Sequence, residues 1–334
     1  MTCPFCHCEE PVIKKCIRHL KNGDDVQKYW CTACERHFNS RTGTVHYRLH
    51  MPEAHAVSIL KSRREGVGVR AAGRLVGHSH CAVMSLEKRD AQAGMLLTLS
   101  FAALFPAVFE CDEVYTRVHH NRPAHESPGW LATAVERNSR FWLPFATGPR
   151  NDTLFQDFAL NALPPMLDCP ETAIVSDGET RYALGAAAWS NSREWIGPPH
   201  DGLGRAEGTR KVWREGLQVA RKVKGSQGSA RRGRIERPGH PHPNTVLLPD
   251  QEIHANHQES QNAALRRRCS AFRRRTNMYA KDQEGLNRAL MVQQLIHNWA
   301  APHWGHDGKQ TPAMFLKQTD RAWTAYDILR LPLT

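Results

Sequence analysis

The chain has 334 residues, with 45 Lys and Arg against 33 Asp and Glu and a formal net charge of +12 at pH 7. This length suggests about two domains. The basic excess favours a polyanionic partner, for which nucleic acid is the usual choice and an acidic membrane surface the alternative. The uncharged run 91–109 nearly has the length of a membrane span. Because Pro106 interrupts it and its end merges with a predicted strand, we expect a buried helix followed by a strand, and no membrane partner.

The N-terminal residues 1–4 lack the basic-then-apolar pattern of a signal peptide. We therefore expect a cytoplasmic protein, whose ten cysteines do not form a disulfide framework. Two Cys-x2-Cys pairs separated by a β-like segment predict a zinc ribbon over residues 1–45, in which four thiolates surround one Zn²⁺. The expected ligands are Cys3, Cys6, Cys31 and Cys34. Cys8 or Cys16 could replace one of them, and the alternative is a set of free thiols in a poorly ordered arm.

Residues 46–104 predict a helix-turn-helix DNA-binding domain and a linker helix. The segment 53–64 has an apolar helical face. Gly73 suits a close helix crossing, Gly77 a left-handed turn, and Ser79 a helix cap. The second helix, about His80 to Arg89, would then lie in the major groove, although a generic helical pair is the alternative. The DNA-binding residues expected from this domain are Arg70, Arg74, His80, Lys88 and Arg89.

Residues 105–334 predict one α/β domain. Strands are expected up to Asp112, over 130–135, over 141–146 and up to Asp177, with helices near 151–162 and 180–188 and a later acidic helix. This order is the one expected of a ribonuclease-H-like fold. Residues near 196–250 are rich in Gly, Pro and basic residues and predict an insertion that contacts phosphates, or else a solvated linker. Within it, 246–248 is a possible strand, and His240 and His242 indicate metal binding only weakly.

Three acidic residues carry the expected chemistry. Asp112 and Asp177 end apolar strands, and Glu259 opens a basic helical stretch. At one sheet edge they could hold two divalent metal ions, Mg²⁺ or Mn²⁺, as phosphodiester chemistry requires. On a helix, Glu259, Asn262 and Arg266 share one face, and arginine forks suit phosphate. A solvated basic helix is the alternative. Further DNA contacts are expected from Asn262, Arg267 and Arg274.

These motifs, in this order, resemble a DDE transposase of the short bacterial insertion sequences, of the insertion-sequence-one type and its relatives. The resemblance covers nearly the whole chain. The residues that carry it are the two cysteine pairs, Arg41-Thr-Gly-Thr, Gly66 to Gly77, Cys111-Asp112-Glu113, Ser176-Asp177-Gly178 with Tyr182, the Glu259 segment, Arg274-Arg275-Thr276 with Lys281, His297-Asn298-Trp299 with His303, Thr311-Pro312-Ala313-Met314, Thr319-Asp320 and Trp323-Thr324.

The resemblance implies an enzyme that recognises the terminal inverted repeats of its element in double-stranded DNA, nicks the ends with water and joins them to target DNA. Asp112, Asp177 and Glu259 match the catalytic triad of the family, and Arg266 matches its basic residue. Gln258 and Ser260 depart from the usual Val and Arg, which keeps Glu252 as an alternative acid. Synapsis of two ends implies a homo-oligomer during the reaction.

Two other classes remain open from the residues. The chain could be a DNA-binding regulator derived from a transposase, with a dead catalytic domain. It could also be a structure-selective nuclease or resolvase that cleaves without strand transfer. The intact acidic trio favours the enzyme over the regulator.

Overall fold

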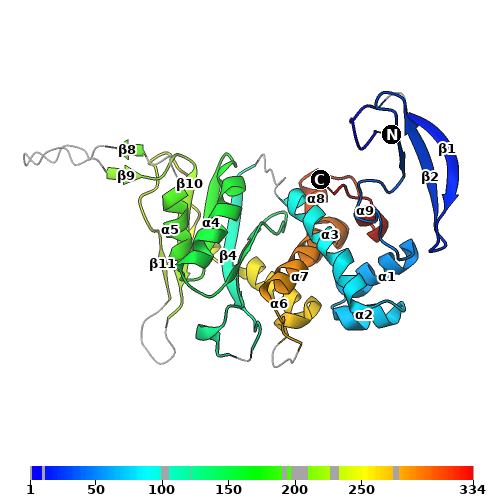
Figure 1. The fold of residues 1–334 in the computed structure, drawn as a ribbon. Helices are drawn as coiled ribbons and strands as arrows, with labels where there is room; N and C mark the ends of the chain where they lie inside the picture. Colours follow the sequence, from blue (N-terminus) through cyan, green and yellow to red (C-terminus); the bar gives the residue numbers. More distant parts are fainter. Residues whose placement is uncertain are drawn as a thin grey trace, which may run out of the picture.

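The computed structural model describes residues 2–9, 12–98, 105–120, 122–189, 194–196, 210–225, 233–273 and 278–333 (Figure 1). The described part is a mixed α/β protein with a six-stranded mixed sheet, and its N-terminal four-cysteine cluster could hold a zinc ion. No helix within the described ranges is long and apolar enough to cross a membrane.

The N-terminal sheet is small and antiparallel. Its strands, in spatial order, are β1 (Val12–His19), β2 (Asp25–Cys31) and β3 (Arg36–Asn39). Nearly every β1 side chain is exposed, and the buried residues beneath the sheet are Cys3, Cys31 and Phe38. So small a core stabilises little by itself, and metal ligation is the usual supplement in segments of this size.

The large sheet has the order β11-β10-β7-β4-β5-β6. At its centre, β4 pairs parallel with β7 and antiparallel with β5, while β10 pairs parallel with β7. The strands β4, β7 and β10 are therefore parallel, and their C-terminal ends point toward the same edge of the sheet. The strands are β4 (Ala107–Tyr115), β5 (Trp130–Glu136), β6 (Ala146–Gly148), β7 (Thr172–Ser176), β10 (Leu217–Val223) and β11 (Arg234–Glu236), and a separate hairpin joins β8 (Glu194–Ile196) to β9 (Arg210–Val212).

Helices cover both faces of this sheet (Figure 1). On one face, α4 (Asp152–Leu167) and α5 (Arg181–Trp189) bury Phe109 and Cys111 of β4. On the other face, α6 (Asn256–Arg268) packs Leu265 against Val114. Because side chains alternate along a strand, Glu110 and Asp112 point with Val114 toward α6, and Glu113 points toward α4 and α5.

The N-terminal helices share a hydrophobic core with the last part of the described chain. This core joins residues 45–93 to residues 292–329. Backbone bonds reinforce it, because Val45 and His46 donate to the carbonyls of Leu331 and Leu329. The elements involved are α1 (Glu53–Arg64), α2 (Val69–Leu75), α3 (His80–Thr98), α7 (Gln283–Leu295), the π-helical turn η4 (Ile296–Ala300), α8 (Pro312–Phe315) and α9 (Ala325–Leu329). Short 3-10 turns are η1 (Ala124–Glu126), η2 (Asp250–Glu252), η3 (Ser270–Phe272) and η5 (Trp304–His306).

Several local expectations about the α2–α3 turn are confirmed. Gly77 has a φ of 71°, in the left-handed region. A Cβ on Gly73 would lie 2.6 Å from the His78 carbonyl oxygen, so only glycine fits this crossing. Ser79 Oγ accepts a hydrogen bond from the Ala82 backbone N–H over 3.2 Å, as a helix cap does. However, α3 continues to Thr98, well beyond the expected end near Arg89.

Some strand expectations were wrong. The expected strand at 141–146 forms only a bridge between Trp142 and Val135, and β6 begins at Ala146. No strand forms at 246–248, because the Gln218 side chain bonds the Val246 carbonyl and the Leu248 backbone N–H there. Instead, β10 lies within the segment that we had interpreted as an insertion, and it pairs along its length with β7.

Candidate functional site

The site lies at the edge of the sheet where β7 and β10 end and where the pairing of β4 with β7 stops. In register, Cys111 of β4 lies opposite Ser176 of β7, and Ser176 lies opposite Arg221 of β10. Asp112 therefore lies level with Asp177, which directly follows β7. Lys224 directly follows β10 at the same edge. The parallel pairing thus gathers two carboxylates and one ammonium from three distant parts of the chain.

The helix α6 is fixed over this edge by Glu110. The Glu110 carboxylate is fully buried and accepts hydrogen bonds from the backbone N–H groups of His257 (2.7 Å) and Gln258 (3.2 Å). These N–H groups belong to the first turn of α6, where a carboxylate satisfies donors that lack helical partners. Arg137 Nε and His257 Nδ1 also contact this carboxylate, at 2.8 and 2.7 Å. Glu110 thus sets the position of the helix that carries Glu259.

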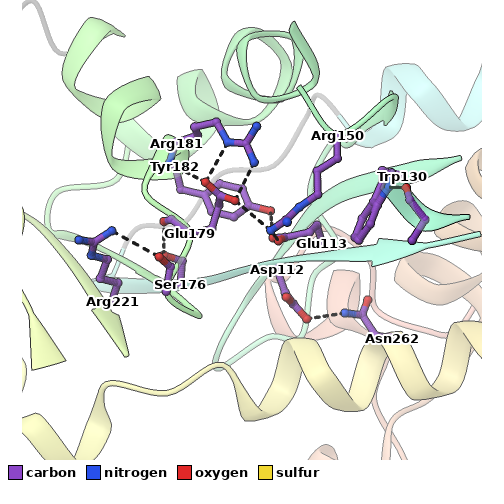
Figure 2. A network of polar contacts seen from close by, with 12 residues as sticks. Asp112, Glu113, Trp130, Arg150, Ser176, Glu179, Arg181, Tyr182, Arg221 and Asn262 are labelled. Carbon is purple, nitrogen blue, oxygen red and sulfur yellow. Dashed lines mark hydrogen bonds and ion pairs between the residues drawn. The ribbon is translucent and has the colours of Figure 1, made fainter. Parts of the chain in front are cut away.

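Contacts from α6 reach both aspartates. Asn262, which is buried one turn after Glu259, donates its side-chain amide to Asp112 Oδ2 over 2.8 Å (Figure 2). The Lys224 ammonium lies 2.5 Å from Asp177 Oδ2 and 3.2 Å from Glu259 Oε1. Asp177 and Glu259 therefore flank a single cation. Glu252, the alternative acid, lies elsewhere, with its carboxylate 3.9 Å from Arg137.

The electrostatic potential at Asp112 is negative, because other carboxylates surround it. Burial and the adjacent Glu113 carboxylate raise the pKa of Asp112 to about 6, and the charges of Asp177 and Glu259 contribute further. Clustered carboxylates that raise one another's pKa are a common property of functional sites, because like charges are costly to hold together unless a cation joins them.

On the opposite face of β4, Glu113 belongs to a network of arginines (Figure 2). Arg150 contacts both Glu113 and Glu179, the latter at 3.0 Å. Arg181 holds Glu179 with two bonds, of 2.9 and 2.8 Å. These two arginines balance two acids, so the Glu113 network is neutralised internally, whereas the Asp112 face has a single lysine for Asp177 and Glu259.

The four cysteines have the geometry of a metal centre. The Sγ atoms of Cys3 and Cys34 lie 3.6 Å apart, as do those of Cys6 and Cys31. Four thiolates at the usual Zn–S distance of about 2.3 Å have sulfur atoms separated by about 3.8 Å, so the cluster fits Zn²⁺. Cys16 is exposed on β1 and lies outside the group, as does Cys8.

One other group of ligand atoms in the described ranges lies within 4.8 Å, that of Glu110, His254 and His257. The oxygens of Glu110 already accept hydrogen bonds from Arg137 and from the α6 backbone. We therefore interpret this group as the contacts that anchor α6, and not as a metal site. The trio of Asp112, Asp177 and Glu259 does not form so tight a group within the described part of the chain. Its oxygen donors have the chemistry that Mg²⁺ and Mn²⁺ prefer, and the Lys224 ammonium already contacts two of the three carboxylates.

The residues expected to contact DNA are distributed over two regions. Arg70, Arg74, His80 and Lys88 are exposed on α2 and α3. Arg89 is half-buried and donates to the carbonyls of Val45 and Tyr47. On α6, Arg266 is half-buried and Arg267 is exposed. Arg274, like the loop arginines Arg231 and Arg232, lies outside the described residues.

Our sequence analysis missed Lys224 and Glu110. The signal for Glu110 was available, because it precedes Asp112 by two residues and therefore shares its strand face. Placing Lys224 would have required the identification of β10, whose second half contains the charged residues Arg221 and Lys222.

A comparison with protein-family models finds no match to this chain, and a comparison with curated proteins finds no significant similarity. The functional interpretation therefore depends on the residues and their geometry.

Proposed function

We propose that the protein is a metal-dependent DNA transposase of the DDE type, which cleaves and joins DNA strands at the ends of an insertion sequence. The observation that carries the proposal is the Lys224 ammonium between Asp177 and Glu259, beside an Asp112 bonded to Asn262 of the same helix. Three acids that are far apart in sequence thus flank one edge of the sheet, where a cation is already favoured.

The sheet topology supports the proposal. The order β6-β5-β4-β7-β10, with three antiparallel strands followed by two parallel ones, is the arrangement that a ribonuclease-H-like domain requires. In open sheets with parallel strands, ligands bind beyond the carboxyl ends of the strands. Asp177 and Lys224 directly follow β7 and β10, and Asp112 lies on β4 just beyond its last pair with β7.

The chemistry follows from the donor set. Asp112, Asp177 and Glu259 would hold divalent cations, which when bound supply positive charge to the attacking and leaving oxygens of a phosphodiester. Asn262 holds one oxygen of Asp112, and the other would be the ligand for a cation. Lys224, on its flexible stem, can move from the carboxylates to a phosphate oxygen of the substrate. Arg266, two turns after Glu259 on α6, is suited to holding the same phosphate.

DNA recognition would come from the N-terminal part of the chain. A zinc ribbon formed by the four cysteines and a helix-turn-helix formed by α2 and α3 would bind the element ends. The net charge of +12 supports a polyanionic partner. A homo-oligomer would form when two ends are brought together.

The test uses the full chain and labelled duplex DNA that carries the ends of its own genomic element. With Mg²⁺ or Mn²⁺, we expect nicked ends and joined products. Asp112→Asn should keep end binding and lose both products, whereas the control Asp157→Asn, an exposed position on α4, should behave as the unmodified chain. Full cleavage by Asp112→Asn would reject the assignment. Binding without any cleavage would identify a regulator, and cleavage without joining a nuclease or resolvase.

A further inference from the structure

Two adjoining grooves lie between the N-terminal sheet and the helices. The first, of ≈ 720 Å³, is lined by the β1–β2 turn and the 41–50 loop. The second, of ≈ 450 Å³, is lined by the same loop and the exposed face of α3. Tyr47 and Arg48 border both grooves. We name this continuous region the junction surface. It links the four-cysteine unit to the helix that was expected to read DNA.

The junction surface is basic. Its lining residues, all within the described chain, include no Asp or Glu. Arg18, Lys21 and Arg48 are exposed, and no ion pair to any described carboxylate forms at these three positions. Arg41 contrasts with them, because Asp24 and Glu53 each hold its guanidinium at 3.0 Å. Arg41 is therefore structural, and the other three cations keep their charge available for a ligand.

The walls of the junction surface are held in place by partly buried polar contacts. Asp24 Oδ2 accepts from the Glu53 backbone N–H over 2.9 Å, and the Asn22 amide donates to the Met51 carbonyl over 2.9 Å. These bonds fix the β1–β2 turn against the start of α1. On the other side, Arg89 of α3 bonds the carbonyls of Val45 and Tyr47. The two grooves are thus preorganised, which lowers the entropy cost of binding.

Arg48 lines both grooves and lies where they adjoin. Its φ is 56°, in the left-handed region that non-glycine residues rarely adopt. Its guanidinium lies 5.1 Å from the centroid of the Tyr47 ring. Backbone strain of this kind persists where the surroundings impose it, and such positions cluster at ligand-binding sites. The aromatic contact orients the guanidinium without neutralising it.

We propose that the junction surface binds the phosphate backbone of duplex DNA, with Arg48, Lys21 and Arg18 contacting phosphates beside the exposed face of α3. A preorganised concavity with exposed, unpaired cations is complementary to a rigid polyanion, and phosphate contacts fix the register of a protein on a duplex. The inference rests on the proposed function only for the identity of the partner as DNA. It assigns DNA binding to the loop 41–50 and to the end of the β1–β2 hairpin, outside both the catalytic edge and the residues expected from the sequence.

The test measures binding of the full chain to a labelled random-sequence duplex of about three helical turns, without Mg²⁺ or Mn²⁺, over a range of salt concentrations. The variants are Arg48→Ala, Lys21→Ala and the double variant. Lys317→Ala is a matched control, because Lys317 is exposed, lines neither groove and has a similar φ of 57°. Zinc content and thermal unfolding of each variant verify that the surface itself is intact.

We expect each single variant to weaken binding roughly tenfold at about 0.1 M salt, and to lower the slope of log K against log salt by about 0.9, the value for one lost phosphate contact. Lys317→Ala should bind as the unmodified chain. Unchanged affinity and slope in the double variant would overturn the proposal. So would a double variant that loses binding to phosphatidylserine vesicles but retains DNA binding. Because the measurement requires no cleavage, its failure is separate from the failure of the acidic trio.

Discussion

The side-chain amide of Asn262 donates a hydrogen bond to the Asp112 carboxylate over 2.8 Å, although 150 residues separate the two in sequence. This bond joins the central strand β4 to α6. The same amide accepts through its oxygen from Gln258 over 3.1 Å, so Asn262 is satisfied on both sides within a buried environment.

Asn262→Ala should destabilise the protein by about 1–3 kcal/mol, the usual cost of leaving buried polar partners unsatisfied. Both the Gln258 amide and the Asp112 carboxylate lose a partner. The measurement is the free energy of unfolding from denaturant titration. Asn161→Ala is the control, because Asn161 is exposed and makes one longer bond of 3.4 Å. Equal losses in the two variants would show that the Asn262 bond adds nothing to stability.

Lys224→Gln should bind Mn²⁺ several-fold more tightly than the unmodified chain, because the ammonium no longer competes for Asp177 and Glu259. The hydrogen bond to Asp177 is the main cause that raises the pKa of Lys224, so the side chain is a cation throughout the neutral range. Calorimetric titration with Mn²⁺ provides the measurement. Lys222→Gln, exposed two residues earlier on β10, is the matched control. If both variants bind Mn²⁺ equally well, Lys224 does not compete with the metal.

Cys31→Ser should abolish zinc binding and expose residues 1–45 to proteolysis. Structural zinc typically contributes roughly 10–16 kcal/mol of apparent binding free energy, and the apolar core here is small. Zinc content by mass spectrometry and limited proteolysis provide the measurement. Cys16→Ser should change neither, because Cys16 is exposed and outside the cluster. A zinc-free N-terminal segment that still resists protease would contradict the metal-centre interpretation.

Asp90→Asn should stabilise the protein at neutral pH. Asp90 is fully buried on α3, and both its oxygens lack a hydrogen-bond partner within the described chain. Burial, followed by the charge of Glu87, raises the pKa of Asp90 well above its usual value. The favourable contribution of the protonated carboxyl is therefore complete below the unfolded pKa and is lost as pH rises through the folded pKa.

The measurement is the free energy of unfolding of Asp90→Asn from pH 5 to pH 8. The gain over the unmodified chain should grow with pH until pH passes the folded-state pKa of Asp90. Asp157→Asn, at an exposed position on α4, should show no such trend. A gain in Asp90→Asn that is independent of pH would mean that folding does not raise the pKa of Asp90.

The strands that carry the acids could be predicted because each apolar run ends in a carboxylate. Asp112 and Asp177 follow buried stretches of β4 and β7, and the cap at Ser79 and the turn at Gly77 follow from local backbone chemistry. Lys224 could not be placed, because the second half of β10 contains the charged residues Arg221 and Lys222, which interrupt the apolar pattern of a buried strand. The pairing of β10 with β7 brings the Lys224 ammonium to Asp177. This pairing is a tertiary contact between distant segments, which no local sequence pattern predicts.

The backbone bonds that tie Val45 and His46 to Leu331 and Leu329 have a consequence for synthesis. Emerging from the ribosome, α1 and α3 must wait for residues 292–329, which complete their shared core. A nascent chain therefore exposes unpacked apolar helices until α9 has been translated. Any truncation before α9 would leave the segment that borders the junction surface without these backbone bonds, so such fragments should compete poorly for a ligand with a chain that includes α9.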